Sequence, residues 1–158
     1  MLLPPYACAI LRCASTGCLL VEERPANART AAGRLTCFGG KLEPDERVAG
    51  CEEAASGGLL RELREELGWQ PAEELRRAVD FYVDGELIAW FYVAAAPPLD
   101  AQLTFEEGRR GLWAPTEELL ADPRLSSWHA VVLRAWRAGE TRADFATPPA
   151  ECVTHGKP

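Results

Sequence analysis

Hydrophobic and polar positions divide the first forty residues into short apolar runs separated by small polar segments. The apolar runs at 6–12 and 18–23 flank the turn-forming sequence Ala-Ser-Thr-Gly, which predicts two strands joined by a turn. The polar segment 24–33 predicts a surface loop. Residues 34–38 then predict a short strand that ends at a Gly-Gly turn, where the backbone can approach a ligand closely.

The middle of the chain carries a pattern typical of a β-hairpin. Apolar-rich segments at 78–83 and 86–94 flank Asp84-Gly85, a dipeptide that suits a tight type I′ turn. The second arm, LIAWFYVA, is apolar almost throughout, so we expect a central strand covered on both faces. Its aromatic residues should lie in the core.

The C-terminal part predicts a short strand and two helices. The strand at 111–114 is followed by a helix from Thr116 and by a second helix at 126–138 with an apolar stripe. Beyond it, Thr, Pro, Ala and Lys predict poor order. We therefore expect one domain over residues 1–140, with a mixed sheet between helices, and a tail over 141–158.

Composition argues against some classes of function. The chain has 158 residues, of which 47% are hydrophobic and 26% charged, as in ordinary globular domains. A net charge of -7 argues against a nucleic-acid polymer as partner, although metal ions let acidic enzymes bind nucleotides. The apolar N-terminus lacks a basic region and is interrupted by Pro4-Pro5, so we expect neither a signal peptide nor a membrane span.

Six cysteines raise the question of a disulfide scaffold. Several of them lie in apolar runs, and no C-x-x-C pair exists. We interpret them as reduced, mostly buried thiols of a cytoplasmic protein. The cysteines are Cys8, Cys13, Cys18, Cys37, Cys51 and Cys152.

The stretch 61–69, RELREELGW, carries the strongest candidate chemistry. On a helix, Glu62, Glu65 and Glu66 share one face, and Arg61 stands four residues before Glu65. Carboxylates this close repel one another unless a cation neutralises them, and oxygen-only ligands favour Mg²⁺ or Mn²⁺. The alternative is a solvated helix face, because Glu-rich helices with arginine are common on protein surfaces.

This stretch resembles the second half of the Nudix box, G-x5-E-x7-R-E-U-x-E-E-x-G-U, in which U is a bulky apolar residue. Every defined position of that half is present: Arg61, Glu62, Leu63, Glu65, Glu66, Gly68 and Trp69. Gly40 and Glu46 match the first half, but fourteen residues separate Glu46 from Arg61 where the family has seven. Glu53 restores the family spacing, so either Glu46 or Glu53 is a candidate partner of Arg61.

The seven extra residues affect the expected helix. Gly57 and Gly58 each cost a helix about 1 kcal/mol relative to alanine. We therefore expect an enlarged loop or a short extra helix over 47–56, followed by a helix that begins at Gly57 or Gly58 and ends at Leu67.

The resemblance implies a fold and a set of roles. The fold is the Nudix α/β/α sandwich, an α/β structure of the α+β type. Glu65 and Glu66 would be the principal metal ligands, Glu62 a further ligand or base, and Arg61 would orient a glutamate. A backbone carbonyl from Gly40 would join the metal shell.

Further site candidates lie outside the box. The segment FEEGRRGLWAPTEEL is similar to the late segment of the family, in which a loop glutamate completes the metal site or serves as base. Glu106 and Glu107 are the candidates, and Glu107 is favoured because it is nearer the tryptophan strand. Arg24 and Lys41 are candidate substrate-binding residues, although a solvated loop arginine is the alternative for Arg24 and for Arg29.

Members of the family hydrolyse a phosphoanhydride bond of a nucleoside diphosphate derivative with Mg²⁺, for which Mn²⁺ can substitute. The favoured substrate is a (deoxy)nucleoside triphosphate, cleaved to monophosphate and pyrophosphate. The run 33–41 is also similar to that of enzymes that clear oxidised purine nucleotides. ADP-ribose, NADH and coenzyme A remain alternative substrates, and a non-catalytic nucleotide-binding module remains an alternative function. A homodimer is a possible oligomeric state.

Overall fold

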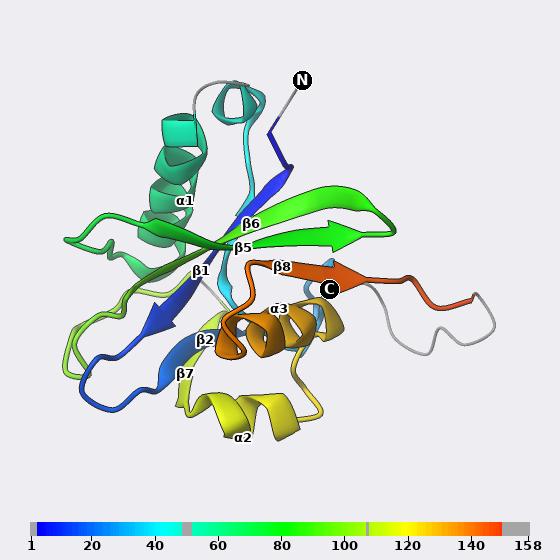
Figure 1. Ribbon diagram of the computed structural model, residues 1–158. Coiled ribbons are helices and arrows are strands. Elements are labelled where there is room, and N and C mark those ends of the chain that lie inside the picture. Colours follow the sequence, from blue (N-terminus) through cyan, green and yellow to red (C-terminus); the bar gives the residue numbers. More distant parts are fainter. Residues whose placement is uncertain (1–2, 49–51, 107, 150–158) are drawn as a thin grey trace.

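Eight strands among residues 3–48, 52–106 and 108–149, which the computed structural model describes, form one mixed sheet (Figure 1). The strands are β1 (Tyr6–Arg12), β2 (Leu19–Glu23), β3 (Leu35–Thr36), β4 (Phe38–Lys41), β5 (Arg76–Val83), β6 (Glu86–Ala95), β7 (Arg110–Ala114) and β8 (Arg142–Phe145). The helical elements are the 3-10 turn η1 (Pro44–Arg47) and the α-helices α1 (Glu52–Leu67), α2 (Thr116–Ala121) and α3 (Ser127–Arg137). Their arrangement confirms the predicted mixed sheet with helices.

Helices cover both faces of the sheet, with α1 on one side and α2 and α3 on the other (Figure 1). Leu59, Leu63 and Leu67 stand four residues apart on α1 and are fully buried against the sheet. Burial of each leucine side chain contributes about 1.5–3 kcal/mol. Alternate residues of β1 belong to the two apolar clusters, as the two-residue period of a strand requires.

The edge of β1 is divided between two strands. β1 pairs in parallel with β6 along its whole length, which makes β6 a central strand as predicted. On its other edge, Tyr6–Ala9 pairs with β4, whereas Leu11 and Arg12 pair with β2. β2 then continues beside β7. β4 and β2 therefore diverge from this edge of β1, and Gly39, Gly40 and Lys41 of β4 line the pocket described below together with Arg24, which follows β2.

The predicted hairpin is confirmed. β5 and β6 pair in antiparallel fashion, and the turn residues Asp84 and Gly85 both have positive φ, 49° and 83°, as a type I′ turn requires. The aromatic residues of β6, Trp90, Phe91 and Tyr92, are buried.

Gly39 and Gly40 lie inside β4, so the prediction of a Gly-Gly turn is wrong. Gly39 has a φ of 135°, and a Cβ atom there would lie 2.3 Å from the carbonyl oxygen of Ala7 on β1. Glycine is required because the two backbones approach too closely for any side chain.

α1 is one continuous helix from Glu52 through both glycines, so the expected start at Gly57 or Gly58 is wrong. The buried apolar face of α1 outweighs the unfavourable helix propensity of the two glycines. Gly58 also has a packing role, because a Cβ atom there would lie 2.6 Å from the side-chain carboxyl carbon of Glu46. The part of the expected 47–56 loop at 49–51 lies outside the described residues.

The chain after Gly139 was expected to be poorly ordered, which is wrong for the four residues of β8. β8 pairs in parallel with β5, and its Ala143 is buried. The Arg142 guanidinium lies 3.7 Å from the centre of the Tyr82 ring. A strand this short, with one buried residue, leaves little periodic signal in the sequence.

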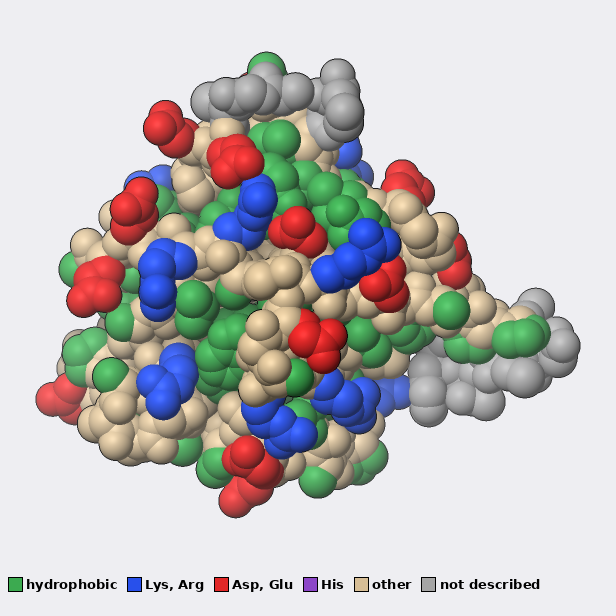
Figure 2. Space-filling view, viewed as in Figure 1, with side chains coloured by type: hydrophobic (Ala, Val, Ile, Leu, Met, Phe, Trp, Pro, Cys, Tyr) green, Lys and Arg blue, Asp and Glu red, His purple; other side chains and the backbone are tan. Residues whose placement is uncertain are grey.

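Basic and acidic side chains are interspersed on the face that Figure 2 shows, and no single basic patch is visible there. Among the described residues, no helix combines the length and apolarity that crossing a membrane would need.

The two helix glycines make a matched pair for a stability test. No atom lies within 4 Å of a Cβ placed at Gly57, so Gly57→Ala should raise the free energy of unfolding by roughly 0.5–1 kcal/mol. Gly58→Ala should instead lower it by roughly 1–3 kcal/mol, because the new methyl group meets Glu46 and Leu42. Urea unfolding of both variants measures the effects, and equal stabilisation by both would show that Glu46 does not pack on Gly58.

Candidate functional site

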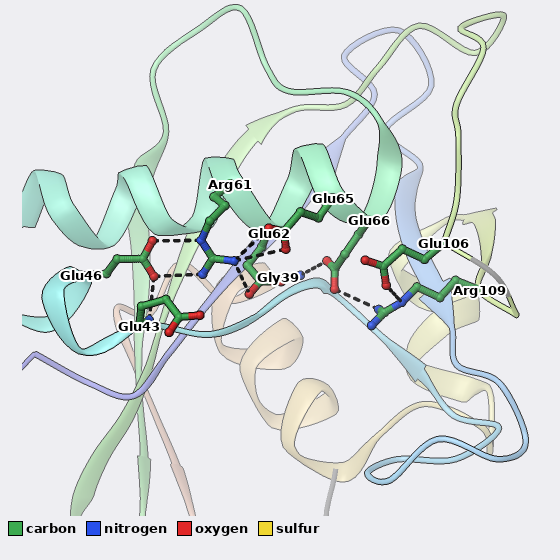
Figure 3. Close-up of polar contacts among 9 residues, drawn as sticks. All are labelled: Gly39, Glu43, Glu46, Arg61, Glu62, Glu65, Glu66, Glu106 and Arg109. Carbon is green, nitrogen blue, oxygen red and sulfur yellow. Dashed lines mark hydrogen bonds and ion pairs between the residues drawn. The ribbon is translucent and has the colours of Figure 1, made fainter.

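Arg61 on α1 connects η1 to the acidic face of the helix (Figure 3). Its Nη2 and Nε donate to the two carboxylate oxygens of Glu46 at 2.9 and 3.1 Å. Its Nη1 donates to Glu62 and to Glu65, each at 3.2 Å. These hydrogen bonds lower the pKa of the Glu46 carboxyl group. Glu53 is exposed, so the structure selects Glu46 as the partner of Arg61.

The inserted residues leave this pairing intact. α1 begins at Glu52, nine residues before Arg61. η1 lies beside this helix, and its Glu46 reaches Arg61. η1 packs against α1 at Gly58, where the missing side chain leaves room for the Glu46 carboxylate. The longer spacing between Glu46 and Arg61 is therefore accommodated by packing of η1 on α1.

Glu66 is the buried carboxylate of the box helix. Its Oε1 accepts a hydrogen bond from the backbone N–H of Gly39 at 2.9 Å, and its Oε2 accepts one from Arg109 Nη1 at 2.9 Å. Burial raises the pKa of Glu66 to about 8, and the nearby Glu22 also raises it, against the lowering effect of Arg109.

Glu22 is a fully buried carboxylate on β2 that the sequence analysis did not identify. It pairs with Arg109 and lies 3.6 Å from Arg24. Its Oε2 is buried and has no hydrogen-bond partner among the described residues. Burial raises the pKa of Glu22. The one feature of the sequence that could have indicated Glu22 is its position directly after the apolar run Leu19–Val21, within a strand that is buried from Leu19 to Glu22.

Glu62 and Glu65 differ in exposure although they stand three residues apart. Glu62 is partly buried and lines the pocket, and burial raises its pKa. A Cβ atom at Gly40 would lie 3.1 Å from Glu62 Oε2, so glycine allows the strand backbone to approach this carboxylate. The Glu65 side chain is 51% exposed and points toward Arg61 (Figure 3).

The pocket beside these carboxylates has a volume of about 380 Å³. Glu62 and Glu66 line it together with the candidate substrate-binding residues Arg24 and Lys41. The rest of the wall is largely apolar and aromatic, with Tyr6, Phe81, Ile88, Ala89, Phe91 and Trp128. One pocket therefore combines acidic, basic and aromatic surfaces.

His129 on α3 also lines the pocket, and the sequence analysis did not propose it. Its Nδ1 accepts a hydrogen bond from the backbone N–H of Cys37 at 3.0 Å. Burial lowers the pKa of His129 to about 3, so the ring is neutral and carries its proton on Nε2. The Thr36 hydroxyl, also in the pocket wall, is buried and has no hydrogen-bond partner among the described residues.

Of the two candidate glutamates in the late acidic segment, the structure describes Glu106. Glu106 pairs with Arg109, with 2.9 Å between Oε2 and Nε. Glu107, the favoured candidate for the metal site or base, lies outside the described residues.

The two loop arginines both lie at the pocket. Arg29 lines the pocket, and Arg24, which also lines it, donates from Nε to the backbone oxygen of Thr30 at 2.8 Å.

Comparison with known proteins places the chain in a family. The family model described as NUDIX domain matches residues 2–136. The chain belongs to the NUDIX family. The family consists of phosphoanhydride hydrolases that act on small-molecule nucleotides.

Several solved protein structures are similar to this chain in fold. The solution structure of the E. coli ORF135 protein is 30% identical, with a TM-score of 0.58, and the match covers 84% of this chain and 87% of that one. The MutT protein from Methanosarcina mazei has a TM-score of 0.65 at 21% identity, with coverage of 84% and 91%. A MutT structure from a study of Aliivibrio salmonicida and Vibrio cholerae is 25% identical, with a TM-score of 0.57 and coverage of 84% and 95%. A comparison with curated protein sequences found no match.

The donor set of this NUDIX domain fits a hard divalent cation in its chemistry. Burial raises the pKa values of Glu62 and Glu66, and Oε2 of Glu22 has no hydrogen-bond partner among the described residues. A cation beside these carboxyl groups would favour their ionised forms, and oxygen ligands suit Mg²⁺ or Mn²⁺. Within the described ranges, however, no three His, Cys, Asp or Glu side chains already form a metal-binding group. Arginine contacts engage Glu62, Glu65 and Glu66, so these carboxylates must reorient to share one ion.

The raised pKa of Glu66 predicts a pH effect on stability. Because the folded-state pKa of about 8 exceeds the ordinary 4.5, unfolding releases a proton between these values, and the free energy of unfolding falls as pH rises through them. Glu66→Gln lacks the titrating carboxyl group, so this fall in the free energy of unfolding is absent in the variant. From pH 5 to pH 8.5, the stability of the variant relative to wild type should rise by roughly 1–3 kcal/mol, measured by urea unfolding with a chelator present.

Glu65→Gln is the matched control, because Glu65 lies on the same helix but is half exposed. The change in its stability relative to wild type over the same pH range should be smaller than that of Glu66→Gln. Parallel pH profiles for the two variants would show that burial does not perturb Glu66.

Proposed function

We propose that this NUDIX hydrolase is a Mg²⁺-dependent pyrophosphohydrolase of a (deoxy)nucleoside triphosphate, which it cleaves to monophosphate and pyrophosphate. Mn²⁺ can substitute for Mg²⁺. The observation that carries the proposal is the composition of the pocket, where Glu62 and Glu66 lie beside basic side chains and an aromatic wall. A nucleoside triphosphate with its cation offers the complementary charges and an aromatic base. A homodimer and a cytoplasmic location stay predictions from the sequence.

The acidic side of the pocket supplies the cation ligands in this proposal. Glu65 and Glu66, with the Gly40 carbonyl and a late-loop glutamate, would hold the ion, and Glu62 would be a further ligand or the base. A bound Mg²⁺ neutralises charge on the phosphate oxygens and lowers the pKa of the attacking water. Arg61 contacts both Glu62 and Glu65, so it can guide the carboxylates as they turn toward the ion.

Proton transfer falls to a carboxylate with a suitable pKa. Burial raises the pKa of Glu62, which makes its carboxylate a stronger base, and Glu62 lines the pocket. A general base works best when its pKa lies near the operating pH. These properties support Glu62 as the group that accepts a proton from water, and they leave Glu107 as the alternative base.

The basic and aromatic sides of the pocket would bind the rest of the substrate. Arg24 and Lys41 lie where they can contact phosphate oxygens. The neutral His129 offers an Nε2–H donor, and the Thr36 hydroxyl has no partner within the described part of the chain, so both can bind polar edges of a base. Phe81, Phe91 and Trp128 supply apolar surface for its rings.

Product analysis with Mg²⁺ tests the proposal. The substrate panel contains nucleoside triphosphates, oxidised purine triphosphates, ADP-ribose, NADH and coenzyme A. Monophosphate and pyrophosphate should form from one triphosphate. Glu66→Gln should lose roughly 100-fold or more in kcat, because it replaces a buried carboxylate of the pocket by a neutral amide.

Glu53→Gln is the control variant, because Glu53 is exposed and does not line the pocket. It should retain wild-type activity. Products from only ADP-ribose, NADH or coenzyme A would preserve the hydrolase and refute the triphosphate. No turnover, combined with thermal stabilisation by a nucleotide, would identify a binding module instead.

A further inference from the structure

Arg109 makes contacts with the carboxylates of Glu22, Glu66 and Glu106 next to the proposed cation site. Figure 3 shows its contacts with Glu66 and Glu106. Its Nη1 donates to Glu66 Oε2 at 2.9 Å and to Glu22 Oε1, and its Nε pairs with Glu106. The Arg109 side chain is only 20% exposed. A cationic group of this chain therefore already occupies the neighbourhood where the proposed function requires a divalent cation.

The two oxygens of Glu66 are held by groups of different mobility. Oε1 accepts from the backbone N–H of Gly39, which β4 fixes through its pairing with β1. Oε2 accepts from the end of the Arg109 side chain, which rotation about its own bonds can move. A divalent cation that binds Glu66 therefore competes with Arg109 and not with Gly39.

Glu22 provides a place for Arg109 after it leaves Glu66. The Oε1 atom of Glu22 already accepts from Arg109, whereas its buried Oε2 has no partner among the described residues. A guanidinium group can donate to both oxygens of one carboxylate in parallel. Such a pairing would satisfy the unpartnered Oε2 and keep the buried charge of Glu22 neutralised.

We propose that Arg109 is an internal counter-ion that a divalent cation displaces from Glu66, and that Glu22 then binds its guanidinium through both oxygens. The exchange frees a Glu66 oxygen for the cation. Because Arg109 also holds Glu106, cation binding is coupled to the segment that precedes β7. This inference rests on the cation site of the proposed function and adds a group that regulates its occupancy.

Mn²⁺ binding, followed by electron paramagnetic resonance without substrate, tests the competition. Arg109→Gln should bind Mn²⁺ about 5-fold or more tightly than wild type, because the competing cation is absent. Loss of any nearby positive charge also favours Mn²⁺, so a second variant must measure that effect alone. Arg24→Gln is suitable, since Arg24 lies 3.6 Å from Glu22, has the same 20% side-chain exposure and, among the described contacts, does not bind Glu66.

Displacement predicts a larger gain in affinity for Arg109→Gln than for Arg24→Gln. Equal gains would reduce Arg109 to a general electrostatic effect and overturn the proposal. Arg109→Lys keeps the charge but lacks the planar guanidinium that spans two carboxylates, so its affinity should lie between those of wild type and Arg109→Gln.

A measurement on the wild-type protein needs a variant only to assign one signal. The Nε–H signal of Arg109 in a ¹⁵N spectrum, assigned by its loss in Arg109→Lys, should shift as Mg²⁺ is added. An unchanged signal in a protein that binds Mn²⁺ would overturn the displacement and leave the cation site in place. Absence of Mn²⁺ binding in wild type and in Arg109→Gln would instead refute the cation site itself.

Discussion

The structure depends on the compensation of carboxylates that are removed from water. Glu22 and Glu66 are both buried, and their mutual repulsion adds to the cost of desolvation. Arg109 bridges them, and a backbone N–H of β4 holds the second oxygen of Glu66. When both carboxylates of such a buried pair are ionised, their charge requires compensation by a cation, whether a guanidinium group or a metal ion.

The fold brings this charge to one place through close backbone contacts. β4 and β2 diverge from the same edge of β1, and α1 lies across β4 on one face of the sheet. Glycines permit the contacts: Gly39 lets β4 approach β1, Gly40 lets it approach Glu62, and Gly58 admits Glu46 against α1. The regular leucine face of α1 fixes the helix, and with it the direction of its carboxylates.

Local sequence patterns predicted most helices and strands and the acidic helix of the Nudix box. Features that depend on contacts between distant residues could not be predicted in this way. The spacing of Arg61, Glu62, Glu65 and Glu66 identified the acidic helix because helical geometry alone places these residues together. The choice of Glu46 over Glu53 required the packing of η1 on α1, which depends on Gly58 and not on residue spacing. Helix propensity predicted a helix that begins at Gly57 or Gly58, whereas α1 continues through both. Burial of its apolar face outweighs the unfavourable propensity of the two glycines.

The buried partners of the site were the least predictable part. Glu22 lies forty-four residues before Glu66, and Arg109 forty-three residues after it, so only the sheet and the late segment bring them into contact. His129 likewise reaches the pocket from α3 through its bond to Cys37, which is ninety-two residues away. No short motif in the chain encodes such contacts, whereas the pairing of β2 with β1 and β7 makes them possible.

The proposed divalent-cation site lies at the carboxylates beside β4. A crystal structure determined with Mn²⁺, with data collected for anomalous scattering, would locate the cation itself. We expect an anomalous peak between the carboxylates of Glu62 and Glu66, with Arg109 moved away from Glu66. Saturating Mn²⁺ without a peak at these residues, and with Arg109 still bound to Glu66, would contradict this expectation.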